Sequence, residues 1–482
     1  MTVSPTDRRP ESHHYRPDID GLRAIAVISV LMFHLNVSPF GGGFVGVDIF
    51  FVISGYLITG VIYDELQRDK FSLSNFYVRR VRRIFPALYL TIALTLAAAV
   101  VVFEPYEMQQ LFDPLRYLSV FQSNLYFMRA GGYFDAPIEA NLLLQTWSLS
   151  VEEQFYLFFP VLLLLAQRFV RPYMRSLILT IAVISLAVGA VRLNLEPQKT
   201  FFATEVRVFE LMIGAIVALG FRRPLDRPAT RTAVATLGFV TMIGSVFFLS
   251  STVPFPGPNA LPVCVGTALI IWAGERGGTT FINRMLAWRP LVGIGLISYS
   301  VYLLHWPILV LAKRILLAEL MLVEKGVLAI ASLGAGYLSW RFIETPFRRA
   351  GPTPSARVFG TAVGLIAVLG LGSIGAIHLI RLPPTDVFEA AERSRRIANA
   401  DPCLLQSSML PGAWRAEICV TGDKGKLIAV WGDSYAAHYF DAFRNLAAKS
   451  GTRLVLFGSG SCPPAVGLEL KERPSAAISM RW

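Results

Sequence analysis

Long apolar stretches constrain this chain more than any other feature of its sequence. A helix needs about 20 mostly apolar residues to cross the hydrocarbon core of a bilayer, and eleven candidate stretches lie between residues 21 and 380. The eighth is the weakest because it is short and begins among prolines. The predicted spans are Gly21–Val37, Phe44–Tyr63, Ile84–Phe103, Leu142–Ala166, Leu177–Val191, Phe202–Gly220, Ala233–Leu249, Leu261–Ala273, Leu291–Leu311, Leu320–Phe342 and Val358–Ile380. We therefore predict an all-α polytopic membrane bundle of about ten core spans and one linking span.

Composition supports a membrane protein and excludes several other classes. Hydrophobic residues make up 54% of the chain and charged residues 16%, whereas soluble domains carry roughly 25% charged residues. Abundant aromatics, the lack of a glycine repeat and a total of four cysteines exclude a disordered chain, a collagen and a disulfide scaffold. The net charge of +12 is distributed between the apolar runs. We therefore expect the lipid bilayer as a partner and no nucleic acid.

Basic residues flank the spans asymmetrically, which predicts the orientation of the chain. With a cytoplasmic N-terminus, the inner segments hold 24 Lys and Arg residues and the outer loops hold 7. The first 20 residues are polar and carry no cleavable signal peptide. An odd number of spans then places the tail outside the cytoplasm. We predict a cytoplasmic arm at 1–20, a membrane domain at 21–349, a linker with the eleventh helix at 350–381, and an extracytoplasmic domain at 382–482.

The tail differs in composition from the membrane part. A charged stretch at Asp386–Ala398 is typical of a helix. Further on, Lys426–Trp431 predicts a buried strand, Gly432–Ser434 a sharp turn, and Tyr435–Ala448 a helix. The tail is thus expected to contain a βα unit.

The first and second spans each carry an ionisable side chain. Such side chains are costly at membrane depth and often mark a function. His34 lies in the first span. It is either a base that accepts a proton from a sugar hydroxyl or a hydrogen-bonded core residue. Asp48 lies one turn inside the second span, where a structural ion pair and a catalytic role are equally open.

Other spans carry further candidates. Glu152 and Glu153 are neighbours in the fourth span, so they point about 100° apart and at most one is expected to enter a cavity. Arg207 and Glu210 are three residues apart and are expected to pair along one helix face. His305 is either a second cavity residue or a partner for the backbone group freed by the following proline.

The densest basic cluster comprises Arg79, Arg80, Arg82 and Arg83, directly before the third span. Anchoring at the cytoplasmic face would explain its charge. Four guanidinium groups within two turns exceed that need, and guanidinium groups bind phosphates well. The cluster is therefore a candidate site for a phosphate-bearing cytoplasmic donor such as coenzyme A.

Six segments, taken together and in this order, resemble the bacterial acyltransferase-3 family of membrane O-acyltransferases. They are YRPDIDGLRA (Tyr15–Ala24), FH (Phe33–His34), GVDIFFVISGY (Gly46–Tyr56), RVRR (Arg80–Arg83), WSLSVEEQFY (Trp147–Tyr156) and YLLHWP (Tyr302–Pro307). The resemblance runs from about Tyr15 to Arg349.

This resemblance implies transfer of an acyl group, usually acetyl from cytoplasmic acetyl-CoA, to a hydroxyl of an extracytoplasmic glycan such as lipopolysaccharide O-antigen, peptidoglycan or exopolysaccharide. It also implies location in the bacterial inner membrane, and no metal is expected. His34 matches the family's essential histidine. Arg80 and Arg83 match its Arg-x-x-Arg motif, with the register open by one residue. Glu152 or Glu153 matches the acid of the fourth span.

The tail resembles the SGNH hydrolase-like domain that is fused to many members of this family, through VWGDSY at Val430–Tyr435. The resemblance makes Ser434 a nucleophile on a strand-to-helix turn. Two departures weaken that role. Tyr435 stands where the fused domains often have histidine, and the late Asp-x-x-His pair is absent, because no histidine follows His438 and no aspartate follows Asp441. We therefore predict a partial, truncated domain with an unproductive Ser434.

Cysteine usage fits such a domain. Cys264 lies in an apolar span and is expected to be inert. In an oxidising compartment Cys403 and Cys419 are expected to form a disulfide. Cys462 then lacks a mate within the tail.

The leading hypothesis is a membrane O-acyltransferase in which Arg80 and Arg83 bind the donor's phosphates and His34 acts as the base or as a transient acyl carrier. Intramembrane charge and interrupted spans also fit a secondary transporter or a flippase for a glycan precursor. A third hypothesis is a membrane-anchored sensor with the tail as its binding module.

Overall fold

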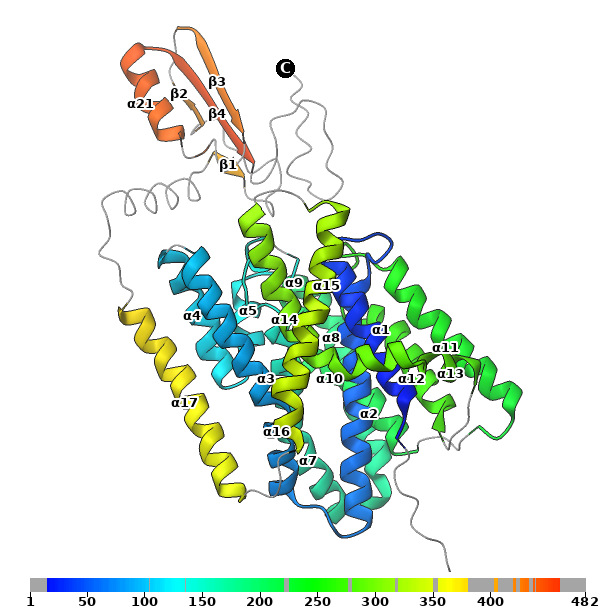
Figure 1. Cartoon of the computed structure of the whole chain (residues 1–482). Coiled ribbons are helices and arrows are strands. Elements are labelled where there is room, and N and C mark those ends of the chain that lie inside the picture. The colour runs from blue at the N-terminus through cyan, green and yellow to red at the C-terminus, as the bar shows by residue number, and fades with distance from the viewer. Residues whose placement is uncertain are drawn as a thin grey trace, which may run out of the picture. The chain divides into compact units, whose positions relative to one another are not determined.

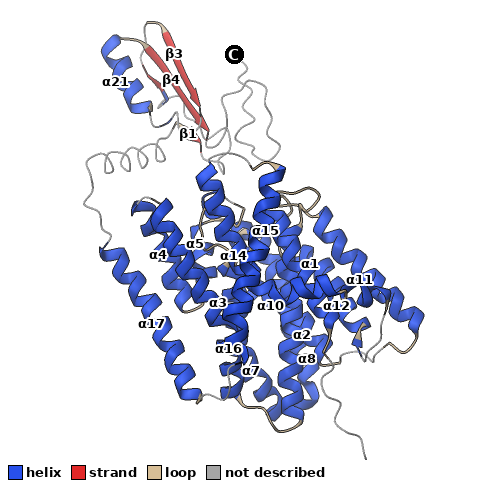
Figure 2. Ribbon diagram, in the orientation of Figure 1, coloured by secondary structure: helices blue, strands red, loops and turns tan. Residues whose placement is uncertain are grey.

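The computed structural model describes residues 15–103, 105–134, 136–220, 225–275, 280–316, 320–349, 354–379, 403–405, 419–421, 425–432, 437 and 439–459. The chain divides into two compact units, Met1–Arg381 and Leu382–Trp482. In the described part of the first unit all regular structure is helical, and strands occur in the second unit (Figure 2).

The first unit is a bundle of long helices joined by short ones (Figure 1). Its α-helices are α1 (Pro17–His34), α2 (Gly46–Gln67), α3 (Leu73–Val102), α4 (Pro105–Ser119), α5 (Ser123–Ala130), α6 (Ala136–Glu139), α7 (Thr146–Phe169), α8 (Met174–Leu195), α9 (Pro197–Thr200), α10 (Thr204–Ala218), α11 (Pro228–Phe248), α12 (Leu261–Ala273), α13 (Phe281–Leu286), α14 (Arg289–Leu316), α15 (Leu322–Ser339), α16 (Thr345–Arg349) and α17 (Ser355–Leu379). Short 3₁₀ helices occur at Gly43–Val45, Arg171–Tyr173 and Gly257–Ala260, and a π turn at Trp340–Glu344.

The prediction of an all-α membrane unit is confirmed. Each of the eleven predicted spans coincides with a helix. Among the described residues, eight helical segments are long and apolar enough to cross a membrane by themselves. The others are α1, α10 and α12. α1 carries three charged residues within 18 positions, and α10 and α12 are only 15 and 13 residues long. These three pack inside the bundle, where α1 lies against α14 and α2, and α10 against α2 and α8.

Helices α4, α5 and α6 occupy a segment that the hydropathy pattern left as an outer loop. α4 mixes charged residues with an apolar stripe of Met108, Leu111, Leu115 and Leu118, which are buried and spaced three or four residues apart. Its average hydropathy is therefore too low to suggest a span. α17 packs against α4 and α3 (Figure 1).

Close helix crossings fix the central helices. Gly55 of α2 faces Leu211 of α10, and Gly214 of α10 faces Val52 of α2. A Cβ atom at either glycine would overlap the carbonyl oxygen opposite it. Glycine therefore allows the two backbones to touch.

The second unit contains a small sheet of β1 (Leu404–Leu405), β2 (Val420–Thr421), β3 (Leu427–Gly432) and β4 (Arg453–Ser459), together with α21 (Phe440–Ser450). β4 pairs in parallel with β3, from Leu427 opposite Arg453 to Gly432 opposite Gly458. It also pairs in parallel with β1 and antiparallel with β2. The predicted βα unit is thus present.

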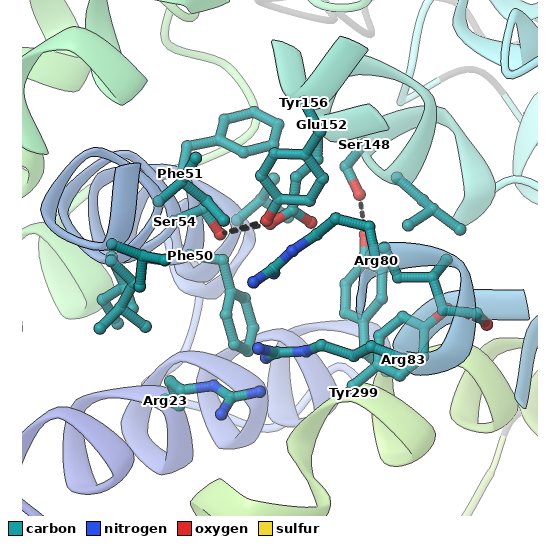
Figure 3. Close-up of a pocket in the computed structure, with 18 residues that line it drawn as sticks. Arg23, Phe50, Phe51, Ser54, Arg80, Arg83, Ser148, Glu152, Tyr156 and Tyr299 are labelled. Carbon is teal, nitrogen blue, oxygen red and sulfur yellow. Dashed lines mark hydrogen bonds between the residues drawn. The ribbon is translucent and has the colours of Figure 1, made fainter. Parts of the chain in front are cut away.

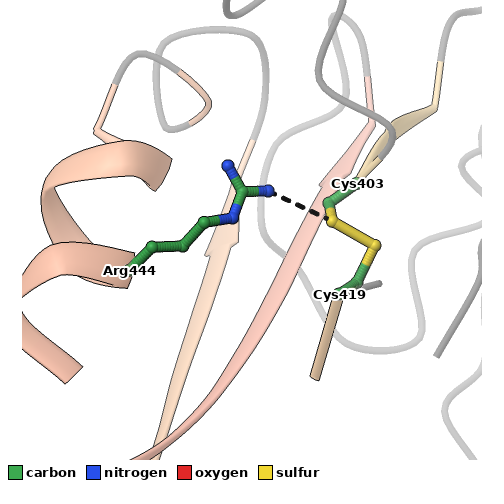
Figure 4. The surroundings of a disulfide bond; sticks show 3 residues. All are labelled: Cys403, Cys419 and Arg444. Atoms are coloured by element: carbon green, nitrogen blue, oxygen red, sulfur yellow. Dashed lines mark hydrogen bonds between the residues drawn. A yellow bond between two sulfur atoms is a disulfide. The ribbon is translucent and has the colours of Figure 1, made fainter. Parts of the chain in front are cut away.

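A disulfide joins Cys403 to Cys419, as predicted, with a Cα–Cα distance of 5.5 Å (Figure 4). A terminal nitrogen of Arg444 on α21 lies 3.5 Å from the Cys403 sulfur. Cys264 is a buried free thiol, also as predicted. The turn with Ser434, the stretch Asp386–Ala398 and Cys462 lie outside the described residues.

Candidate active site

Helix α3 directs half of its basic cluster into a cavity. Arg80 and Arg83 are three residues apart, so they share one face of the helix, and both line a cavity of about 230 Å³ between α1, α2, α3, α7 and α14. Arg79 instead pairs with Glu65, 2.9 Å away, and is largely exposed. Arg82 does not line the cavity. The structure therefore selects the register that begins at Arg80.

A third guanidinium group, that of Arg23 on α1, lines the same cavity (Figure 3). Arg23 lies 3.4 Å from Asp20 on its own helix. The Cζ atom of Arg80 lies 5.5 Å from the ring centroids of Phe76 and Tyr156, and its Nε has no hydrogen-bond partner among the described residues. Positive charge thus predominates in the wall of this cavity, which favours an anionic ligand.

Glu152 is the acid of the fourth span that enters the cavity. Its Oε1 accepts hydrogen bonds from the hydroxyls of Ser54 and Tyr156 (Figure 3). Glu153 does not line the cavity, and its Oε1 is buried without a hydrogen-bond partner among the described residues. This agrees with the expectation that at most one of the neighbouring acids enters.

Tyr302 of α14 connects this cavity to His34. Its ring lines the cavity, and its hydroxyl lies 2.6 Å from the Ser148 hydroxyl and 3.2 Å from the Gln145 carbonyl oxygen. Its ring centroid lies 5.6 Å from that of His305, one turn further along α14. Tyr302 thus lies between the arginine cavity, which it lines, and His305, the hydrogen-bond partner of His34.

His34 forms a hydrogen-bonded pair with His305. The two rings are nearly parallel, with an interplanar angle of 15° and centroids 5.2 Å apart, and His34 Nδ1 lies 3.0 Å from His305 Nε2. His34 Nε2 lies 2.9 Å from the Tyr133 hydroxyl. Trp306 packs edge-on against His34 with ring centroids 4.5 Å apart. His34 thus faces polar and aromatic groups of the protein, not the acyl chains of lipids.

The contacts of His305 determine which nitrogen of a neutral His34 carries its proton. His305 Nδ1 faces two backbone carbonyls, of Tyr302 at 2.7 Å and of Val301 at 3.2 Å. Carbonyl oxygens only accept hydrogen bonds, so Nδ1 must carry the hydrogen and Nε2 must be the acceptor. His34 then donates from Nδ1 to His305. This leaves His34 Nε2 with its lone pair toward Tyr133, whose hydroxyl donates to it.

Asp48 lies in a different environment. It is 1% exposed and lies 3.1 Å from Arg207, which also lies 2.9 Å from Glu210. Asp48 does not line the arginine cavity. The Cζ atom of Arg207 lies 4.6 Å from the Phe201 ring centroid and 5.2 Å from that of Phe255. Of the two roles left open for Asp48, this placement favours the structural one.

Several residues of the site, Arg23 and Tyr302 among them, were not singled out from the sequence. Tyr156 follows Glu152 by four residues, so helix spacing alone could have brought them together. Ser54 looked like a packing residue because it lies among small residues. Tyr133 lies on a short segment between helices, and no local pattern indicates that it reaches His34.

Comparisons with known proteins identify the family of the chain. Residues 16–379 match the acyltransferase domain, and residues 402–480 match the SGNH domain that is fused to acyltransferase-3 domains. The YrhL protein of Bacillus subtilis (strain 168) is 34% identical over 375 residues, which cover 73% of this chain and 58% of YrhL.

Two further relatives carry names that state an activity. The peptidoglycan O-acetyltransferase OatA of Listeria monocytogenes is 34% identical over 358 residues, covering 70% of this chain and 57% of that protein. The O-acetyltransferase OatA of Staphylococcus aureus (strain NCTC 8325 / PS 47) is 31% identical over 357 residues, covering 70% and 58%. The matched part thus spans little more than half of these relatives. No solved structure matches the chain.

Proposed function

Because the chain belongs to the acyltransferase-3 family, we propose that it is a membrane O-acetyltransferase. It moves an acetyl group from cytoplasmic acetyl-CoA to a hydroxyl of an extracytoplasmic cell-wall glycan. The names of the OatA relatives favour peptidoglycan as the acceptor. The proposed location is the bacterial inner membrane with the N-terminus in the cytoplasm, which follows from the distribution of basic residues.

The single observation that supports this proposal best is the set of guanidinium groups around one cavity. Arg23, Arg80 and Arg83 face a space in which Glu152 is the only carboxylate among the described lining residues. Buried cations are costly unless an anion accompanies them. The phosphates of coenzyme A would supply that charge, and the planar guanidinium forks would bind them in a bidentate manner.

The distance between donor site and base is measured along α1. Arg23 and His34 are eleven positions apart on this helix, which corresponds to about 16 Å at 1.5 Å per residue. The pantetheine arm of the donor would cover this distance and carry the thioester past Tyr302. The phosphates would remain with the arginines.

The proposed chemistry takes place at His34 Nε2. A sugar hydroxyl gives its proton to Nε2 while its oxygen attacks the thioester carbonyl carbon. The carbon–sulfur bond breaks as the ester bond forms, and the leaving thiolate takes the proton from the imidazolium. His305 acts as a positioning residue, because its Nε2 holds His34 in the tautomer that carries its lone pair at Nε2. In this scheme transfer is completed without a productive step at Ser434.

The test is O-acetylation in cells. A strain that lacks the gene is complemented with the wild-type chain or with variants, and its peptidoglycan and surface polysaccharides are examined by NMR for O-acetyl signals. We expect the wild-type chain to restore the signals, and we expect Arg83→Ala and His34→Ala to lose them. Arg82→Ala is the matched control, since Arg82 is the preceding residue and does not line the cavity.

Two results would overturn the proposal. Absence of O-acetyl signals with the wild-type chain would show that the chain lacks the proposed acetyltransferase activity. Full acetylation with His34→Ala, together with a loss of glycan export, would instead support a transporter or flippase.

A further inference from the structure

A second cavity, of about 280 Å³, is lined by Tyr133, the residue whose hydroxyl contacts His34. Three segments line it: the one after α5, helix α9 with the residue that follows it, and the loop after α11. α8 and α11 begin at the same face of the bundle as α1 in the predicted topology. The segments that follow them therefore lie at the His34 end of the bundle, away from the arginines.

The cavity combines an aromatic floor with a polar rim. Tyr133, Phe201 and Phe255 form the floor and are 4–6% exposed. Gln198 and Thr252 stand at the rim and are exposed. A pyranose ring has the same division, with an apolar face of C–H groups and a periphery of hydroxyls. Pockets with apolar walls and a few polar groups bind small molecules in a defined orientation.

The aromatic floor packs on a buried arginine. Tyr133 and Phe201 are stacked with centroids 4.2 Å apart. Arg207 lies over the rings of Phe201 and Phe255 and donates from Nε to the Phe201 carbonyl oxygen at 3.0 Å. Asp48 and Glu210 fix this guanidinium group in turn. The buried ion cluster thus supports a binding surface.

Tyr133 belongs to both sites. Its ring forms part of the cavity floor, and its hydroxyl donates to His34 Nε2 at 2.9 Å. A sugar hydroxyl that displaces the Tyr133 hydroxyl would meet the lone pair that is needed to deprotonate it. The base thus lies one hydrogen bond away from a residue of the cavity floor.

We propose that this second cavity is the acceptor subsite, in which one pyranose unit of the glycan packs on Tyr133, Phe201 and Phe255 with a hydroxyl directed at His34 Nε2. This inference rests on the proposed function. It implies two chambers with separate ligands. The arginine cavity binds the donor, the aromatic cavity binds the acceptor, and the histidine pair lies between them.

The test uses substitutions that narrow the mouth of the second, aromatic cavity and leave the arginine cavity unchanged. Full-length chain in lipid nanodiscs is assayed with acetyl-CoA and with soluble peptidoglycan fragments released by a muramidase. Gln198→Trp and Thr252→Trp each place a bulky ring at the mouth. Lys199→Trp is the matched control, because Lys199 neighbours Gln198 and is exposed but does not line the cavity.

We expect each mouth variant to raise the acceptor KM about tenfold or more, which corresponds to about 1.4 kcal/mol of lost binding. The dissociation constant for acetyl-CoA should remain within a factor of two. Lys199→Trp should behave like the wild-type chain in both measurements. An unchanged acceptor KM in both mouth variants would overturn the assignment.

A second measurement needs no turnover. Saturation-transfer NMR on the His34→Ala variant should show contact between the protein and the sugar ring protons of the fragments, and adding Thr252→Trp should abolish it. Contact that persists in the double variant would place the acceptor elsewhere. If the wild-type chain transfers acetyl groups while both mouth variants keep the wild-type acceptor KM, only the assignment of the acceptor subsite is refuted. If the wild-type chain transfers none, the proposed function itself fails.

Discussion

Replacing Arg207 with methionine should destabilise the membrane unit severely. The arginine lies 3.1 Å from Asp48 and 2.9 Å from Glu210, whose carboxylates are 1% and 0% exposed. Methionine keeps the apolar contact with the neighbouring rings but removes the positive charge. Removing one partner of a buried ion pair costs about 3–5 kcal/mol. Two hydrogen bonds to charged groups, at about 1.5–3 kcal/mol each, give the same range.

A triple variant separates the loss of charge balance from the loss of packing. Arg207→Met combined with Asp48→Leu and Glu210→Met replaces the whole ion cluster with apolar side chains. Such replacements of buried ion pairs are often neutral or stabilising. We therefore expect the triple variant to recover most of the stability that the single variant loses.

The assay is unfolding of the purified chain in mixed detergent micelles, monitored by tryptophan fluorescence. The single variant should unfold at a clearly lower denaturant concentration than the wild-type chain, and the triple variant between the two. A single variant as stable as the wild-type chain would refute the reasoning, because the two carboxylates would then need no cation. A triple variant less stable than the single one would show that packing dominates.

Two further predictions concern other parts of the chain. Gly55→Ala should cost about 1–3 kcal/mol of unfolding free energy in the same assay, because its Cβ would overlap the Leu211 carbonyl oxygen. Gly60→Ala on the same helix has open space around it and should be neutral or slightly stabilising, so equal effects would contradict the close crossing. Cys403→Ala removes a disulfide with Cys419 across a sequence separation of 16, which should cost about 3 kcal/mol. Limited proteolysis should then cut the tail as fast as it cuts the reduced wild-type chain, and unchanged resistance would show that the disulfide contributes little.

The sequence predicts the helices of the bundle well because apolar length is a local property. The hydropathy pattern did not predict helix α4 for the same physical reason. An amphipathic helix of 15 residues carries too many polar groups to register as a span. The βα unit of the tail was predictable from its alternating strand and turn signals, although β3 ends one residue later than expected.

The site was only partly predictable. His34 stands out because charge is rare at membrane depth, and Arg80 and Arg83 stand out because they belong to a dense basic cluster. The partners of His34 come from far along the chain, since Tyr133 is 99 and His305 is 271 residues away. No sequence pattern brings such residues together. The choice between Glu152 and Glu153 likewise depends on how α7 is rotated in the bundle, which packing alone decides.

The most direct test of the account is acetyl transfer across a bilayer by the purified chain. Proteoliposomes are loaded with peptidoglycan fragments, and radiolabelled acetyl-CoA is added outside the vesicles. It then reaches the protein molecules whose arginine end faces outward. The account predicts label on the enclosed fragments with the wild-type chain, and loss of that label with His34→Ala while acetyl-CoA binding persists. Undiminished labelling of the fragments by His34→Ala would contradict it.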